Sequence, residues 1–273
     1  MPERAHLVSD KATLAGIAAK IRRADEHIST LDAEFDVFLK EHYQITGSFD
    51  SNLRKYTFTA LGSEALPTRF AVIVGEVAHH LRSALDHLVT QLQFFGAGDG
   101  KPDVLEFPIC RTPKQFEEAC RRGKLTGIPE AALKTIGAVQ PYRTSEPVDS
   151  SALAVLHELD RIDKHRLLLV VVACVQMANT LKVDATRNVT ITGMSPPIPP
   201  GVRPTKEGRA IFDVDFGEEF DPNISIDGNF GFQIVFDQPG VLMNLPVVQT
   251  LKKLRETVAV GLIQRGFFPD FTV

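Results

Sequence analysis

The sequence has little of the material that membrane proteins and disulfide-rich proteins need. Its 273 residues include no tryptophan and only three cysteines, which form no Cys-x-x-Cys pair. An odd number of cysteines excludes a complete intramolecular disulfide framework. The longest fully apolar run, from Leu167 to Val175, has about half of the ~18 residues that suggest a membrane-spanning helix. We therefore expect a cytoplasmic protein with reduced thiols and no membrane partner.

The sequence also lacks an excess of positive charge. It has 30 lysines and arginines against 34 acidic residues, a net charge of −4, and 44% of its residues are hydrophobic. These values exclude a protein coated in positive charge and argue against a disordered chain. The histidines are unevenly distributed along the chain, since five of the eight lie in two short stretches. These five are His79, His80, His87, His157 and His165.

Apolar residues recur at helical spacing in most of the first two thirds of the chain. This pattern predicts long helices over about residues 9–43, 67–95 and 150–166, the second of them opened by a proline. Shorter helices are expected near 113–122 and 129–139.

Strand patterns occupy other parts of the chain. Residues 55–61 alternate between apolar and polar side chains, and so do several segments after Leu181. Asp227 and Gly228 are expected to form a two-residue hairpin turn. The valine-rich stretch after Leu167 fits either a buried helix or a strand.

These elements predict an α+β fold, in which a bundle of long amphipathic helices carries an inserted antiparallel β-sheet. We expect the bundle over residues 1–177, with the strand near 55–61 joining the sheet. The sheet region would follow over 178–245. A C-terminal helix over 246–273 would then pack back on the bundle.

Polar residues stand beside the apolar stripes of two predicted helices. Glu76, His80 and His87 form a polar row on the second long helix, while Asp160 and Asp163 lie in line with leucines on the third. Ionised carboxylates in an apolar seam must be paired, hydrogen-bonded or open to water. The simplest partner is Arg82, whose planar guanidinium can hold a carboxylate. The cluster can thus be explained as a structural ion-pair network.

A metal site is a second interpretation of the same residues. Glu76 and His80 lie one helical turn apart, and Asp160 or Asp163 could complete a set of ligands. However, His80 and His87 are ~10 Å apart along a helix, too far to share one ion. We therefore assign neither a metal nor a cofactor to the chain.

A third interpretation comes from Arg82 and His87, which are separated by four residues. This spacing resembles the arginine and histidine signature of the HEPN superfamily, helical bundles of which many are metal-independent ribonucleases. The resemblance implies that Arg82 stabilises phosphate charge, that His87 handles a proton, and that a second copy of the chain completes the site. Asp86, one turn from Arg82, can also pair with it. Arg161 and His165 form a shorter pair that misses the spacing by one residue.

Four short segments together resemble a group of bacterial proteins that have no known activity. They are residues 80–87 (HLRSALDH), 107–109 (FPI), 140–142 (QPY) and 159–166 (LDRIDKHR). This similarity covers about the central third of the chain.

The leading functional hypothesis is therefore a HEPN-like protein that binds or cleaves RNA without a metal, as a homodimer through its bundle helices. Arg82 and His87 would be catalytic, supported by a polar cluster of Glu76, His80, Asp86, Asp160, Arg161, Asp163 and His165. One alternative is a non-enzymatic binding or scaffold protein in which these residues form a structural network. A second alternative is a metal-binding helical bundle.

Overall fold

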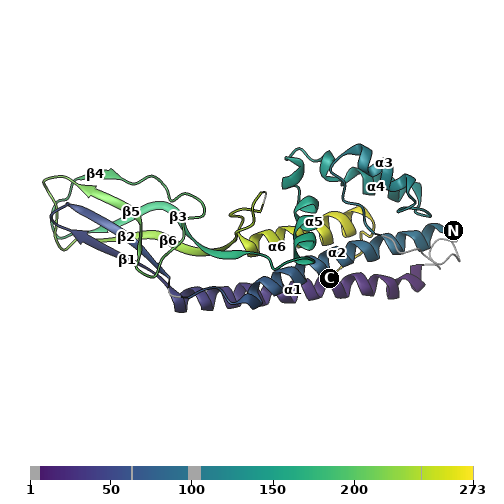
Figure 1. The fold of residues 1–273 in the computed structure, drawn as a ribbon, viewed down its shortest axis with the longest axis horizontal. Helices are drawn as coiled ribbons and strands as arrows, with labels where there is room; N and C mark the ends of the chain where they lie inside the picture. The colour runs from purple at the N-terminus through teal and green to yellow at the C-terminus, as the bar shows by residue number, and fades with distance from the viewer. Residues whose placement is uncertain (1–6, 63, 98–105, 241, 273) are drawn as a thin grey trace.

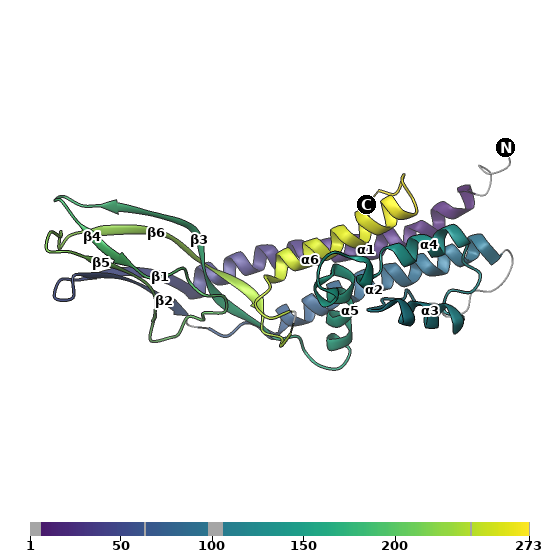
Figure 2. The ribbon, with the colours of Figure 1, turned by 90° about the horizontal axis from the view of Figure 1, so that it is seen from above.

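The computed structural model describes residues 7–62, 64–97, 106–240 and 242–272. It has the mixed α+β architecture expected from the sequence, with two antiparallel sheets. The molecule is elongated, with most helices gathered at one end and the strands at the other (Figures 1 and 2). We call these two parts the helical body and the β arm.

The helical body is organised around two long helices. Helix α1 (Leu7–His42) and helix α2 (Thr68–Ala97) lie side by side and run in opposite directions (Figures 1 and 2). Their predicted apolar stripes face each other, and residues such as Ile21 and Leu81 are fully buried between them. Burial of such stripes, rather than helix propensity alone, provides most of the stability of helices in proteins. No helix within the described ranges is long and apolar enough to cross a membrane.

The remaining helices cover the α1–α2 pair. Helix α6 (Val247–Glu256) packs against α1, α2 and α5, and continues into a π-helical segment (Thr257–Gln264). Its predicted stripe is buried, so the C-terminal helix packs back on the bundle. The other helices are α3 (Pro113–Arg121), α4 (Glu130–Ala138) and α5 (Ala152–Asp163), with short 3-10 turns at Pro141–Arg143 and Val148–Ser150.

The β arm contains a four-stranded sheet and a two-stranded ribbon. The sheet has the order β1-β2-β5-β4, and the ribbon pairs β3 with β6. Aromatic rings fill the space between them: the Phe230 ring of β6 lies 4.7 Å from Phe58 of β2 and 5.2 Å from Phe212 of β5. The strands are β1 (Tyr43–Asp50), β2 (Lys55–Gly62), β3 (Val170–Asp184), β4 (Ile191–Met194), β5 (Arg209–Phe216) and β6 (Ser225–Phe236).

Two expectations, a domain boundary and a hairpin turn, need correction, and one strand was not predicted. The valine-rich stretch is strand β3, so the boundary expected at residue 177 falls inside a strand. Strand β1, which was not predicted, follows α1 directly and forms a hairpin with β2. The hairpin turn predicted at Asp227 and Gly228 is wrong, because both residues pair with β3 inside β6. Gly228 instead makes room for an aromatic ring, since a Cβ there would lie 2.3 Å from an atom of Phe230.

Candidate functional site

The centre of the candidate site is the buried guanidinium of Arg82 on α2, which is only 3% exposed. Its Nη2 donates to Oε1 of Glu106 at 2.9 Å and to the carbonyl oxygen of Phe107 at 2.7 Å. The same nitrogen lies 3.2 Å from Oδ1 of Asp86, one turn further along the helix. Hydrogen bonds between ionised partners are stronger than neutral ones. Arg82 therefore attaches the segment that follows residue 105 to helix α2.

Asp86 strengthens this attachment from the same face of the helix. Its Oδ1 accepts a hydrogen bond from the backbone N–H of Phe107 at 2.8 Å, so α2 binds both the N–H and the carbonyl of this residue. Burial raises the pKa of Asp86, an effect that Arg82 and the Phe107 N–H oppose. Asp86 and Arg82 together hold Phe107 in a fixed position, and the Phe107 side chain is fully buried.

Glu106 lies at the outer end of this network. Its second carboxylate oxygen accepts a hydrogen bond from Nζ of Lys124 at 3.2 Å. Burial by itself would raise the pKa of Glu106, but the positive charges of Arg82 and Lys124 outweigh it and the pKa is lowered. Glu106 is therefore a carboxylate at neutral pH, shared between two cations.

Gln140 holds the next part of the same segment. Its side chain is fully buried, donates to the carbonyl of Pro108 at 3.0 Å, and accepts the N–H of Cys110 at 2.8 Å. Three of the short sequence motifs therefore meet here: 80–87, 107–109 and 140–142. Buried backbone N–H and C=O groups outside helices and strands need hydrogen-bond partners, and the Gln140 side chain provides them here.

His157 of α5 reaches the same place from another helix. It lines a cavity of about 210 Å³ together with Arg82, Glu106 and Lys124. Burial lowers the pKa of His157, and the nearby charge of Arg82 lowers it further. Its Nδ1 is buried and has no hydrogen-bond partner among the described residues, and the same is true of Nη1 of Arg82.

His87 lies elsewhere, although it is on the same helix as Arg82. It is exposed and stands next to Gly16 of α1, where a Cβ would lie 3.3 Å from its Nδ1. Five positions along an α-helix correspond to a rotation of ~140°, which explains the separation. Within one chain, the structure does not bring His87 into the network of Arg82.

The two aspartates of α5 are not partners of Arg82, which corrects the pairing expected from the sequence. Asp160 is buried and pairs with Nζ of Lys164 at 2.7 Å, and Nδ1 of His79 lies 3.9 Å from its other oxygen. Asp163 packs against Gly75 of α2, and burial raises its pKa. Lys164, the residue directly after α5, thus provides the positive charge that the sequence analysis expected from Arg82.

The other predicted cluster residues are dispersed. His80 stacks on His27 of α1 with ring centres 5.8 Å apart, and Glu76 lies 3.5 Å from Nε2 of His27. Arg161 pairs with Glu158, and His165 is exposed. Across the part of the chain that the structure describes, no three His, Cys, Asp or Glu side chains are grouped so as to hold a metal ion.

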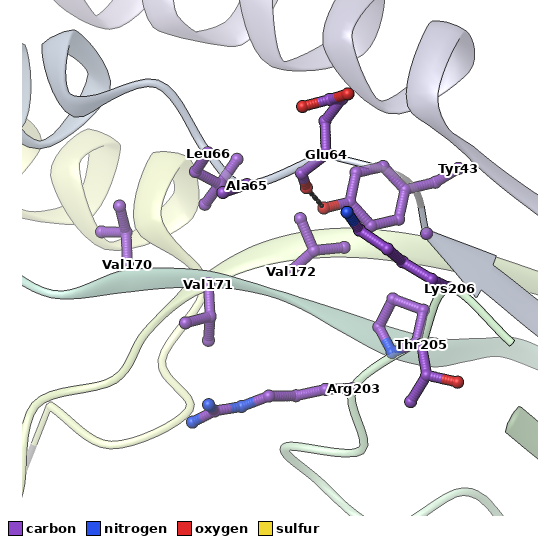
Figure 3. A pocket seen from close by; sticks show the side chains of 12 residues that line it. Tyr43, Glu64, Ala65, Leu66, Val170, Val171, Val172, Arg203, Thr205 and Lys206 are labelled. Atoms are coloured by element: carbon purple, nitrogen blue, oxygen red, sulfur yellow. Dashed lines mark hydrogen bonds between the residues drawn. The ribbon is translucent and has the colours of Figure 1, made fainter. Parts of the chain in front are cut away.

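A larger cavity of about 490 Å³ lies at the junction of the helical body and the β arm (Figure 3). Val170, Val171 and Val172 line it along β3, and Lys206 reaches across it towards Tyr43. The hydroxyl of Tyr43 donates to the carbonyl of Glu64, and burial raises the pKa of this tyrosine. The lining combines these aliphatic side chains with the charged residues Glu64, Arg203 and Lys206. None of the residues of the Arg82 network lines this cavity.

The sequence analysis missed Glu106, which pairs with Arg82, and His157, which lines the cavity beside it. A signal for Glu106 was present, since it directly precedes the 107–109 motif. His157 lies one helical turn before Asp160, so it was a candidate for the same face.

Comparisons of the chain with protein-family models, with curated proteins and with solved structures find no match.

Proposed function

We propose that this chain is a non-enzymatic binding protein in which Arg82, Asp86 and Glu106 form a structural ion-pair network. One observation carries the proposal: Nη2 of Arg82 is buried and already shared by Glu106, Asp86 and the Phe107 carbonyl. A guanidinium held in this way fixes the position of a chain segment. Removing one partner of a buried ion pair leaves the other charge uncompensated, which is strongly destabilising.

The position of His87 supports the same conclusion. Acid–base catalysis requires the proton-transferring group and the charge-stabilising group to reach one reacting centre. Arg82 is buried under the 106–107 segment, whereas His87 is exposed on the side of α2 that faces α1. To use Nη2 of Arg82, a substrate would have to displace Glu106 and the Phe107 carbonyl.

The test is the Arg82→Ala substitution, with the exposed Arg161→Ala as its matched control. Arg82→Ala should lower the free energy of unfolding by about 3–5 kcal/mol, as expected for a broken buried pair. Arg161 pairs with Glu158 on the surface, so its loss should cost less than about 1 kcal/mol. Urea unfolding followed by circular dichroism measures both. An Arg82→Ala protein with the stability of the wild type would refute the structural network.

A metal-independent ribonuclease is the second candidate, favoured by the exposure of His87, which a substrate can reach. In this case a dimer would place His87 of the partner subunit near Arg82. Purified protein would then cleave RNA in the presence of a chelator, and both Arg82→Ala and His87→Ala would abolish cleavage while the chain stays folded. We expect no cleavage that depends on His87.

A further inference from the structure

The four-stranded sheet of the β arm has two edges, formed by β1 and β4 (Figure 1). Strand β1 pairs with β2 on one side, and no other strand within the described ranges is hydrogen-bonded to its second side. The outer side of an edge strand presents a row of backbone N–H and C=O groups with which a further strand can pair. Proteins that keep such an edge free usually protect it, and the two edges of this sheet differ in that respect.

The β4 edge has several of the features that prevent the addition of a strand. It has only four residues, and its register with β5 shifts between Ile191 and Gly193. Two prolines follow it at positions 196 and 197. Short strands, irregular register and proline all interrupt the row of backbone groups that a new strand needs.

The β1 edge has none of these features. The strand is eight residues long, pairs with β2 from Tyr43 to Asp50 without a register shift, and contains neither proline nor lysine. Its length exceeds the usual five to six residues of a strand. The side chains on its outer face, among them Thr46 and Ser48, are exposed. The edge is therefore long, regular and accessible, which are the conditions for pairing with another strand.

The side chains of β1 match a second copy of the same strand. Residues that lie opposite each other in antiparallel strands share one face of the sheet. A two-fold axis at Gly47 therefore places Ile45 opposite Phe49 of the partner subunit, and Thr46 opposite Ser48 of the partner subunit. Apolar side chains then face apolar ones, hydroxyls face hydroxyls, and no like charges are opposed. In each copy, Ile45 and Phe49 already pack on the core of the arm.

We propose that β1 pairs antiparallel with β1 of a second copy of this chain, around a two-fold axis at Gly47. The pairing joins two four-stranded sheets into one continuous sheet and closes both free edges in a single symmetric interface. Strand β1 follows α1 directly and leads away from the helical body (Figures 1 and 2). Antiparallel pairing thus places the two helical bodies at opposite ends of the dimer, and His87 of the partner subunit stays far from Arg82.

The first experiment measures the association of the full chain by sedimentation velocity over a wide range of protein concentrations. We expect a reversible equilibrium between monomer and dimer. A chain that stays monomeric at every concentration leaves the edge to a strand of another protein, and the proposal of a second copy is then wrong.

Two double variants test the interface and its register. Thr46→Lys combined with Ser48→Lys places like charges directly opposite each other twice, so the Kd of the dimer should rise about tenfold or more. Thr46→Lys combined with Ser48→Glu places opposite charges at the same positions, so this variant should dimerise at least as tightly as the wild type. The two variants differ only at position 48. All of these side chains are exposed, so circular dichroism should show an unchanged fold.

Thr192→Lys on β4 is the control at the other edge, and it should leave the Kd unchanged. Unchanged association in the variant with two lysines would show that the dimer forms elsewhere and would overturn the proposal. Weak association of both double variants would overturn the two-fold axis at Gly47, because an axis at Thr46 opposes the lysines at this position in both. These outcomes are independent of the Arg82 network, which lies in the helical body and which none of the substitutions touches.

Discussion

The helical body and the β arm bury different kinds of side chain. The body encloses Arg82, Asp160 and Gln140 within an otherwise apolar core. The core of the arm consists of aromatic and aliphatic side chains such as Phe58 and Phe212. The arm also buries the carboxylate of Asp221, which accepts hydrogen bonds from the backbone N–H groups of Thr186 and Asn223 in its loops. The two parts are alike in that buried charged groups serve segments outside regular structure, and among the described residues the body differs in burying an arginine as well.

The physical reason lies in the backbone. Paired antiparallel strands satisfy their own N–H and C=O groups, so their buried face can be apolar throughout. The segment from Glu106 to Cys110 has no such partner and passes over α2, where its backbone must bond to side chains. Arg82, Asp86 and Gln140 provide these bonds.

The largest expected change in the free energy of unfolding tests whether the helical body and the β arm unfold independently. Phe58→Ala in the arm and Phe70→Ala in the body should each cost about 3–5 kcal/mol, the usual range for a buried phenylalanine. Phe58→Ala should increase amide hydrogen exchange in β2, β5 and β6 but leave α1 and α2 protected. Exchange measured by mass spectrometry checks this. Equal loss of protection in body and arm would show that the molecule unfolds as one unit.

A smaller effect tests the close contact between α2 and α5 in the body. A Cβ at Gly75 would lie 1.9 Å from Oδ1 of Asp163, so Gly75→Ala must displace the Asp163 carboxylate from its place against α2. We expect a loss of about 1–3 kcal/mol, as for overpacking. Gly261→Ala is the control, because its nearest neighbour would be 3.8 Å away. A Gly75→Ala protein that is as stable as the control would contradict the contact.

The pH dependence of stability tests the histidines between α1 and α2. Burial lowers the pKa of His80 below its ordinary value of 6.5, and Lys20, His27, His79 and Arg23 lower it further. As the pH falls through 6.5, the unfolded chain takes up a proton that folded His80 does not, so the folded state loses stability. His80→Gln should therefore lose less stability than the wild type between about pH 7.5 and pH 5.5. Thermal melts at several pH values measure this, and parallel curves would contradict it.

The smallest effect is expected at His87, the residue that the sequence placed in the catalytic pair. His87 is exposed, and surface substitutions of this kind usually change stability by less than about 0.5 kcal/mol. A larger loss in His87→Ala, measured by urea unfolding, would show that the contact of His87 with Gly16 of α1 contributes to stability.

Much of the fold could be predicted because periodicity reports burial directly. The stripes of α1, α2 and α6 recur every three to four residues, and most of the described residues on them are buried. The predictions stayed open or failed where a local pattern has two physical explanations. The valine-rich run fits strand and buried helix equally, and the Asp227-Gly228 pair fits a turn as well as a strand that must leave space for Phe230.

The site was predictable as a list of residue types but not as a set of contacts. Burial of carboxylates near Arg82 on a predicted helix indicated an ion-pair network, and Asp86, one turn away, was among the partners considered. Glu106 could not be identified as a partner, because the distance between it and Arg82 depends on how residues 106–110 pass over α2. In contrast, the separation of Arg82 from His87 could be predicted, because five positions along an α-helix turn the two side chains about 140° apart.

The amino-acid sequence by itself determined which faces of the helices are apolar, which segments alternate as strands, and that buried carboxylates require partners. These properties follow from local spacing and from the cost of burying charge. Only the tertiary structure decided that Arg82 binds Glu106 and not Asp160, and that His157 lines the same cavity. Partner choice depends on distances between segments far apart in the chain, and those distances are set by the packing of the helical core.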